Sequence, residues 1–188
     1  MGCLLTSDYA ATCGTKKKKN GLKGDVYLLN LVDANGVKLA YTETGFTVSD
    51  ITVQSGSQAY KLTGSQLMHT YGSSVSVPTQ GNQFYMQNLV LKLIDDTDAD
   101  LAFIDEVVRS TGLVAVIETY NSQFIILGME NGLRAVEGDM FALDVDPAAD
   151  VSTSIALSSY EDYSKKLFFD TDYATTKAKL EGYLTPAA

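Results

Sequence analysis

Residues 83–129 read QFYMQNLVLKLIDDTDADLAFIDEVVRSTGLVAVIETYNSQFIILGM, and this stretch decides the fold. In 83–94 apolar and polar residues alternate with a slip near Asn88, which predicts a central strand that is bulged or bent. Two strongly apolar segments, 113–119 and 123–129, are separated by a short turn and predict a hairpin whose strands are buried on both faces. We therefore expect a core built mainly from β-strands.

Between these strands the sequence predicts one helix, over 98–110. Thr97 is a candidate N-cap, the acidic residues beside it suit the positive end of the helix dipole, and Thr111-Gly112 ends the pattern. Apolar residues recur at helical spacing and form the expected packing face: Leu101, Ile104, Val107 and Val108.

The same acidic run has some features of a calcium loop, because Asp96, Asp98 and Asp100 stand at alternate positions. However, Leu101 occupies the position of the required glycine, and Val107 occupies that of the bidentate glutamate. Complementation of the helix dipole explains the acidic residues more simply, so we expect no bound metal.

Shorter patterns predict further strands along the chain. Residues 26–32 and 37–41 are expected to pair as a hairpin across a turn at 33–36. The remaining strands are expected at 46–48, 51–53, 74–77, 133–136, 141–145, 154–160 and 166–169.

Three segments surround or interrupt this β-rich part. Residues 1–24 are small, polar and punctuated by glycine, and they predict an N-terminal arm. Residues 54–82, which are rich in glycine, predict a long loop, and 171–188 predict a weakly helical or extended tail. The expected fold over 25–170 is mainly β (α+β): two packed antiparallel β-sheets, sandwich- or barrel-like, flanked by one α-helix.

Composition excludes several classes of function. The 188 residues are 45% hydrophobic and 20% charged, which fits a soluble globular protein with no apolar run long enough for a membrane span. A net charge of -9 argues against a nucleic-acid binder with a basic face. Cys3 and Cys13 both lie in the arm, so a bridge between them would not staple the core.

Enzyme chemistry is poorly supplied. His69 is the single histidine, so a histidine-based metal site is excluded and a catalytic triad would depend on this one residue. The chain has neither a G-x-S-x-G elbow nor a glycine-rich phosphate loop. We therefore expect no enzyme and no cofactor.

The N-terminus leaves one other class of function open. Residues 2–6 fit a myristoylation pattern, Cys3 is placed to carry a second acyl chain, and the run Lys16–Lys19 suits contact with anionic lipid. A lipid-anchored binding module is therefore an alternative. We interpret the lysines as a solvated arm or a subunit contact, and we expect no membrane partner.

The order of the elements resembles a known family. QFYMQNLVLKLI, the acidic-capped helix, LVAVIETYNSQFIILGMENGLRAVEGDMFALD and SIALSSYE follow one another as in structural proteins of tailed phages that infect Bacteroidetes-type bacteria, most closely tail tube proteins. The opening MGCLLT, its second cysteine and GLKGDVYLLNL are also similar. The likeness is one of pattern and extends over about residues 1–162.

The resemblance implies a ring of six subunits, whose inner strands close into a β-barrel, and rings that stack into a tube. Unpaired sheet edges suit such closure. We therefore expect a non-enzymatic virion protein, made in the host cytoplasm, that self-assembles and contacts other tail proteins. Its acidic lumen would let DNA pass without specific binding.

A head-decoration, connector or head–tail joining protein is the alternative within the virion. In either case the arm and the long loop are the expected clasps between subunits. The candidate inter-subunit contacts in these two segments are Lys16, Lys17, Lys18, Lys19, Tyr60, Leu67, His69 and Tyr71.

Overall fold

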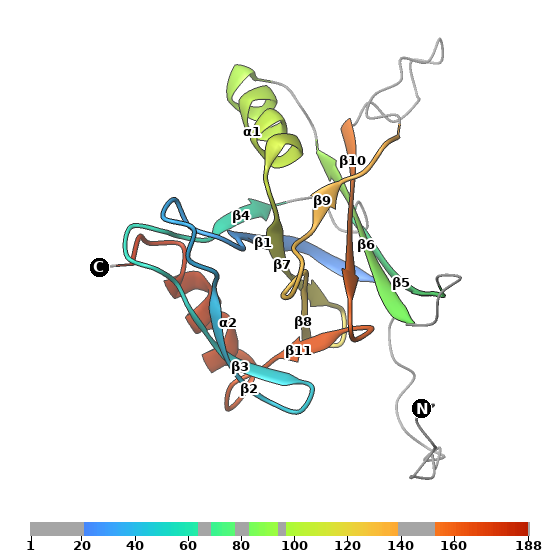
Figure 1. Cartoon of the computed structure of the whole chain (residues 1–188). Helices are drawn as coiled ribbons and strands as arrows, with labels where there is room; N and C mark the ends of the chain where they lie inside the picture. The colour runs from blue at the N-terminus through green and yellow to red at the C-terminus, as the bar shows by residue number, and fades with distance from the viewer. Residues whose placement is uncertain (1–20, 64–68, 78–82, 94–96, 139–152, 188) are drawn as a thin grey trace.

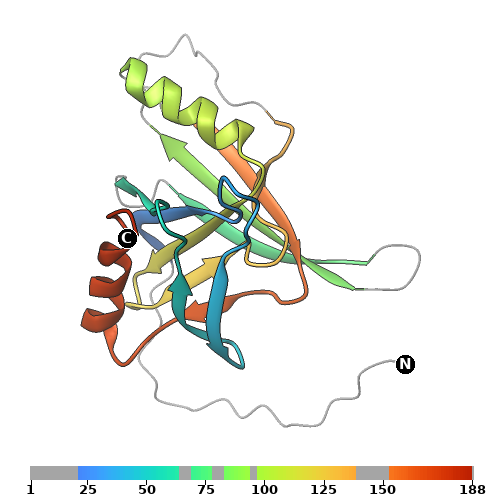
Figure 2. The ribbon, with the colours of Figure 1, turned by 60° about the vertical axis from the view of Figure 1, so that its left-hand side comes forward.

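The structure, a computed structural model, describes residues 21–63, 69–77, 83–93, 97–138 and 153–187. In these residues the protein has three layers: a C-terminal helix, a seven-stranded sheet and a four-stranded sheet (Figure 1). A second helix stands at one end of the two sheets (Figure 2). The predicted mainly β (α+β) class is confirmed, and neither sheet closes into a barrel within the described residues.

The seven-stranded sheet is the middle layer. Its strand order is β2-β3-β11-β8-β7-β1-β4, and only the pair β3–β11 is parallel. The strands are β1 (Leu22–Asn30), β2 (Ala40–Thr44), β3 (Thr47–Thr52), β4 (Tyr60–Thr63), β7 (Leu113–Thr119), β8 (Phe124–Leu127) and β11 (Lys166–Phe168).

The four-stranded sheet is antiparallel throughout, with the order β5-β6-β10-β9. Its strands are β5 (Thr70–Ser76), β6 (Phe84–Leu93), β9 (Arg134–Ala135) and β10 (Thr153–Glu161). The strand expected at 141–145 lies outside the described residues.

Two apolar cores hold the layers together, one on each side of the seven-stranded sheet. Alternate residues of β1 point to opposite sides: Leu28 packs between the sheets, whereas Leu29 packs in the core that includes Leu180 of the C-terminal helix. The apolar hairpin β7–β8 is confirmed, and its strands bury both faces as predicted. Each such buried aliphatic side chain stabilises the fold by about 1.5–3 kcal/mol.

The hairpin expected between 26–32 and 37–41 does not form as predicted. The turn is present, and Asp33 Oδ1 accepts hydrogen bonds from the main-chain nitrogens of Asn35 and Val37 at 2.8 and 2.7 Å. However, only one isolated bridge follows it, and the next strand, β2, pairs with β3. The neighbours of β1 are instead β4 and β7, whose first five residues are all apolar, and these strands bury more of its surface.

The prediction of one long loop over 54–82 is wrong, because the structure places two strands there, β4 and β5. β4 pairs with β1, and β5 pairs with β6. Ala59 and Leu62 are also buried. Glycine and serine dilute the alternation of apolar residues in this segment, so composition alone made it look like a loop. Leu22 likewise belongs to β1 and not to an N-terminal arm.

Helix α1 (Asp98–Arg109) confirms the predicted helix and its cap. Thr97 Oγ1 accepts from the main-chain nitrogen of Asp100 at 3.3 Å, and Asp100 Oδ2 accepts from that of Thr97 at 3.0 Å, which forms a capping box. Ile104 and Val107 are buried between the sheets, and Val108 is half-buried against the same core.

Leu101 does not belong to the packing face of α1, contrary to prediction. Its side chain is 52% exposed, while Phe103 packs against the core. Leu101 lies in the N-terminal half of α1, and in Figures 1 and 2 the helix reaches beyond the sheets. Apolar spacing gives the direction of a side chain, but not whether a neighbouring element is present to cover it.

The tail that was expected to be weakly helical or extended forms helix α2 (Tyr173–Gly182), so the described residues contain two helices and not the single one predicted. The buried Glu118 accepts hydrogen bonds from Lys23 Nζ at 2.5 Å and from the Tyr173 hydroxyl at 2.6 Å. Glu181 accepts from the buried Tyr27 at 2.6 Å. Hydrogen bonding to Glu118 raises the pKa of Lys23, and hydrogen bonding from Tyr27 lowers the pKa of Glu181. Polar contacts therefore supply much of the docking of α2, which apolar periodicity does not detect.

Candidate functional site

The central strand of the four-stranded sheet is β6. It pairs in continuous register with β5 on one side and with β10 on the other. The slip predicted near Asn88 is absent, because Gln87 fills an inward position that an apolar residue usually takes. The backbone therefore alternates regularly, and the apparent slip arises because Gln87 points inward while the apolar Phe84 and Met86 point to the opposite face.

Gln87 ties the two sheets together. Its fully buried carboxamide donates from Nε2 to the carbonyl oxygen of Tyr163 at 3.1 Å, and Oε1 accepts from the main-chain nitrogen of Gly128 at 3.0 Å. Gly128 has φ +72°, and a Cβ there would lie 2.6 Å from the carbonyl oxygen of Leu113. Gln87 is therefore a structural residue that apolar patterning misses.

A buried carboxylate nearby is also satisfied by the fold. Glu161 accepts from the main-chain nitrogens of Glu130 and Asn131 at 2.9 and 3.2 Å, and from Ser159 Oγ at 2.5 Å. Through the two main-chain donors, Glu161 holds the turn at Glu130 and Asn131, which leads into β9. The group thus fixes the turn and offers no free acid or base for catalysis.

β5 forms one border of the four-stranded sheet, and it is unprotected. None of the described strands pairs with its second edge. Thr70–Ser76 contains no charged residue and no proline, its pairing with β6 has no bulge, and most of its side chains are exposed. Proteins usually protect an edge strand with charge, proline or a bulge. β5 has none of these and can accept another strand.

The opposite border is only partly covered. β9 pairs with β10 at two positions, Ala135 with Leu157 and Arg134 with Ser158, whereas β6 pairs with β10 along its whole length. Within the described residues, most of the outer edge of β10 is therefore also without a paired strand. The sheet can be extended at both borders.

The borders of the seven-stranded sheet differ from those of the four-stranded sheet. β2 has a register shift between Thr42 and Glu43, and Glu43 accepts from Lys166 Nζ at 2.5 Å. β4 carries Lys61, which pairs with Glu181 at 2.9 Å. A bulge and charged residues make these borders poor templates for another strand. The uncharged edge of β5 is thus the distinctive one.

One face of the four-stranded sheet, which we call the outer face, points away from the seven-stranded sheet. None of its residues belongs to either core, and none is aspartate or glutamate. Its residues are Thr70, Gly72, Ser74 and Ser76 of β5, Phe84, Met86, Asn88, Val90 and Lys92 of β6, Ser154, Ala156, Ser158 and Tyr160 of β10, and Arg134 of β9.

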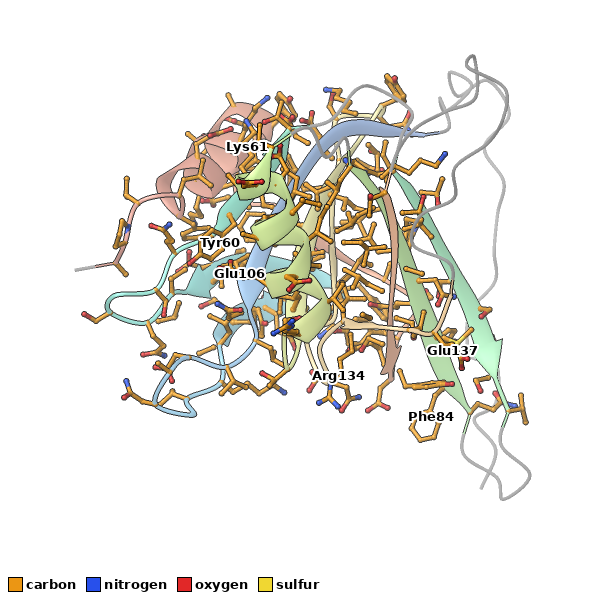
Figure 3. All side chains as sticks on the ribbon, turned by 90° about the horizontal axis from the view of Figure 1, so that it is seen from above. Tyr60, Lys61, Phe84, Glu106, Arg134 and Glu137 are labelled. Carbon is orange, nitrogen blue, oxygen red and sulfur yellow. The ribbon has the colours of Figure 1, made fainter. Side chains whose placement is uncertain are left out.

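The structure separates the candidate inter-subunit contacts. Tyr60 is exposed on the edge strand β4, far from Phe84 of the four-stranded sheet (Figure 3). Tyr71 is half-buried, and its hydroxyl donates to the carbonyl oxygen of Ser164 at 2.8 Å. Five candidates lie outside the described residues: Lys16, Lys17, Lys18, Lys19 and Leu67.

His69 is not available as an inter-subunit contact, contrary to prediction. Its side chain is buried at the start of β5, where Nδ1 accepts from the main-chain nitrogen of Lys92 at 3.2 Å. Burial lowers the pKa of His69, and the main chain of Gly24 offsets part of this effect. The neutral imidazole therefore anchors β5 to β6.

This burial predicts a loss of stability in acid. Because the pKa of His69 is lower in the folded state than its unfolded value of 6.5, the unfolded state binds the proton first as the pH falls below about 6.5. The resulting loss is at most about 1.4 kcal/mol per pH unit. Urea unfolding at pH 7 and pH 5 should show a larger loss for the wild type than for His69→Gln. Equal losses would show that His69 does not titrate on unfolding.

The described residues show no metal centre. They hold no group of three or more histidine, cysteine, aspartate or glutamate side chains placed to bind an ion. Asp100 is engaged in the cap of α1, Asp98 is exposed in its first turn, and Asp96 lies outside the described residues. No helix in the described ranges is long and apolar enough to cross a membrane.

Comparisons with protein families, with curated proteins and with solved structures found no match to this chain. The geometry of the four-stranded sheet is therefore the main guide to function. Sequence reasoning identified its central strand β6, but of the edge strand β5 (Thr70–Ser76) it predicted only the C-terminal half, as a strand at 74–77. The available signal was the β-branched and aromatic residues Thr70, Tyr71 and Val75, which serine and glycine obscured.

Proposed function

We propose that this chain is a structural subunit of a bacteriophage virion with the role of a tail tube protein. Copies assemble when the edge of β5 in one subunit pairs with the β9–β10 border of the next. The protein has no enzymatic role in this proposal, and it acts in the virion after synthesis in the host cytoplasm. The resemblance of the sequence pattern to tail tube proteins supports the choice of virion component.

The observation that carries the proposal is the uncharged, bulge-free edge of β5. Its seven residues offer a row of main-chain groups to another strand, and the partly covered border of β10 lies at the other side of the same sheet. Two different borders that meet make a heterologous contact, which closes into a ring when the rotation between subunits allows it. The β2 border, with its register shift, is protected against the same contact.

Packing decides which face of a closed ring points inward. The seven-stranded sheet and α2 both lie on one side of the four-stranded sheet, opposite the outer face (Figure 1). In a closed ring the bulkier layers fit best at the outside, where the circumference is larger. The outer face of the four-stranded sheet therefore lines the enclosed space. That face carries no carboxylate on its strands, and the lumen in this proposal is therefore not acidic. Most of its side chains are uncharged, so phosphate contacts would be few and DNA could pass without tight binding.

Negative-stain electron microscopy of the purified chain over a range of concentrations tests the proposal. Six-fold rings or hollow tubes are expected, because paired edges add subunits in one direction. Monomers that persist at high concentration would contradict it. Trimers would also contradict it and would favour a head-decoration protein. Intact-mass analysis of the N-terminus in the same preparation tests the lipid-anchored alternative, which requires an acylated Gly2.

A further inference from the structure

Arg134 of β9 places a guanidinium on the outer face. Most of the described lysines, and the other arginine, Arg109, have a carboxylate partner; Arg109 pairs with Asp105 at 3.0 Å. Among the described residues Arg134 has no such partner and is exposed. A guanidinium presents several N–H donors in one plane, which suits a phosphate or a carboxylate.

The surroundings of Arg134 form a shallow hollow and not a flat surface. Ser158 is its cross-strand neighbour, while Phe84, Tyr160 and Val136 form apolar walls. Figure 3 shows Arg134 and Phe84 on the same side of the molecule, and both line this hollow. A ligand that fits has an anionic group for the guanidinium, an acceptor for the Ser158 hydroxyl and less polar parts for the walls.

We propose that the outer face is a weak contact surface for a nucleic-acid backbone and that Arg134 is its phosphate-binding residue. This inference rests on the proposed function, which places the outer face around an enclosed space. A phosphodiester backbone provides the anionic oxygens, and its sugars provide the apolar surface that Phe84 and Tyr160 can contact.

The charge distribution directs a polyanion to this face. The chain has a net charge of -9, and α1 exposes Asp98, Asp105 and Glu106 at the end of the molecule. Such surfaces repel phosphate, whereas the strands of the outer face carry Arg134 and no acidic residue. The contrast between faces matters here more than the overall charge.

The contact is necessarily weak and sensitive to salt. Each neutralised phosphate contributes a slope of about -0.9 in a plot of log affinity against log salt concentration. One guanidinium per subunit therefore gives little binding alone, and an assembly that presents many copies gives more. A weak contact of this kind holds DNA near the wall without preventing its movement.

Fluorescence anisotropy with a labelled DNA duplex tests the proposal on the assembled full chain. At low salt, Arg134→Gln should weaken binding about tenfold or more and flatten the salt dependence. The Arg134→Lys variant, which keeps the positive charge, should retain most of the wild-type affinity for DNA. Lys165→Gln is the matched control, because Lys165 also has no partner among the described residues but lies in the groove beside His69 and Gln123. Its affinity should stay within about twofold of the wild type.

Three results would overturn the inference: no binding by the wild type, equal effects of the Arg134 and Lys165 variants, or stronger binding of poly-glutamate than of DNA. The last result would indicate an acidic protein partner. The assembly state is measured first by sedimentation, because failure to assemble contradicts the proposed function. DNA binding by unassembled protein that depends on Arg134 would leave this inference standing.

Discussion

Replacing Ile104 by aspartate should destabilise the protein by roughly 3–5 kcal/mol, which is a large part of the stability of an ordinary domain. Ile104 is buried at the end of the core between the two sheets, where α1 closes that core. A carboxylate there would lose its hydration, and the described core around it offers no cation. Chemical denaturation followed by circular dichroism gives the change directly.

Leu101→Asp is the matched control, because it makes a similar substitution on the same helix. Leu101 is 52% exposed, so its carboxylate would stay hydrated and would lie near the positive end of the helix dipole. We expect a change within about 0.5 kcal/mol. A similar loss of stability in both variants would show that α1 packs in an orientation other than the one described.

The second large effect is expected from proline in β5, introduced separately at Ser73 and at Ser74. In an antiparallel pair, consecutive residues point their N–H and C=O groups alternately toward the partner strand and toward the free edge. One proline therefore removes a hydrogen bond to β6 and destabilises the monomer. The other removes a group from the free edge and should abolish assembly while the melting temperature of the monomer stays within about 3 °C of the wild type.

Threonine at the same two positions is the control, since it keeps the main-chain N–H and suits a strand. Both threonine variants should assemble like the wild type in sedimentation velocity. Assembly by both proline variants would contradict a role for the β5 edge. Loss of monomer stability in both would show that the second edge of β5 is already paired within one subunit.

Patterns that reflect burial were readable from the sequence. Alternation and apolar runs predicted β6 and the hairpin β7–β8, and capping chemistry predicted α1 with its N-terminal residue Thr97. These elements lie in or against the cores, where the period of apolar residues follows from the geometry of the backbone. The buried Gln87 was the exception, because hydrogen bonds to distant main-chain groups replace apolar contact there.

Elements held by polar or main-chain contacts were not readable in this way. α2 docks through the buried Glu118 and through Glu181, whose partners lie far away in the chain. β5 has almost no apolar face, and its strand conformation depends on pairing with β6. The edge that we propose for assembly was therefore the part that sequence patterning described least well, because an edge strand carries little of the core.

Hydrogen exchange of the amides in 70–77 tests the pairing of β5 between copies most directly. The exchange is measured by mass spectrometry on dilute protein and on concentrated, assembled protein. The account predicts that about half of these amides are protected at both concentrations by β6, and that the remainder become protected only in the concentrated sample. Identical exchange at the two concentrations, in a sample that sedimentation shows to be assembled, would contradict it.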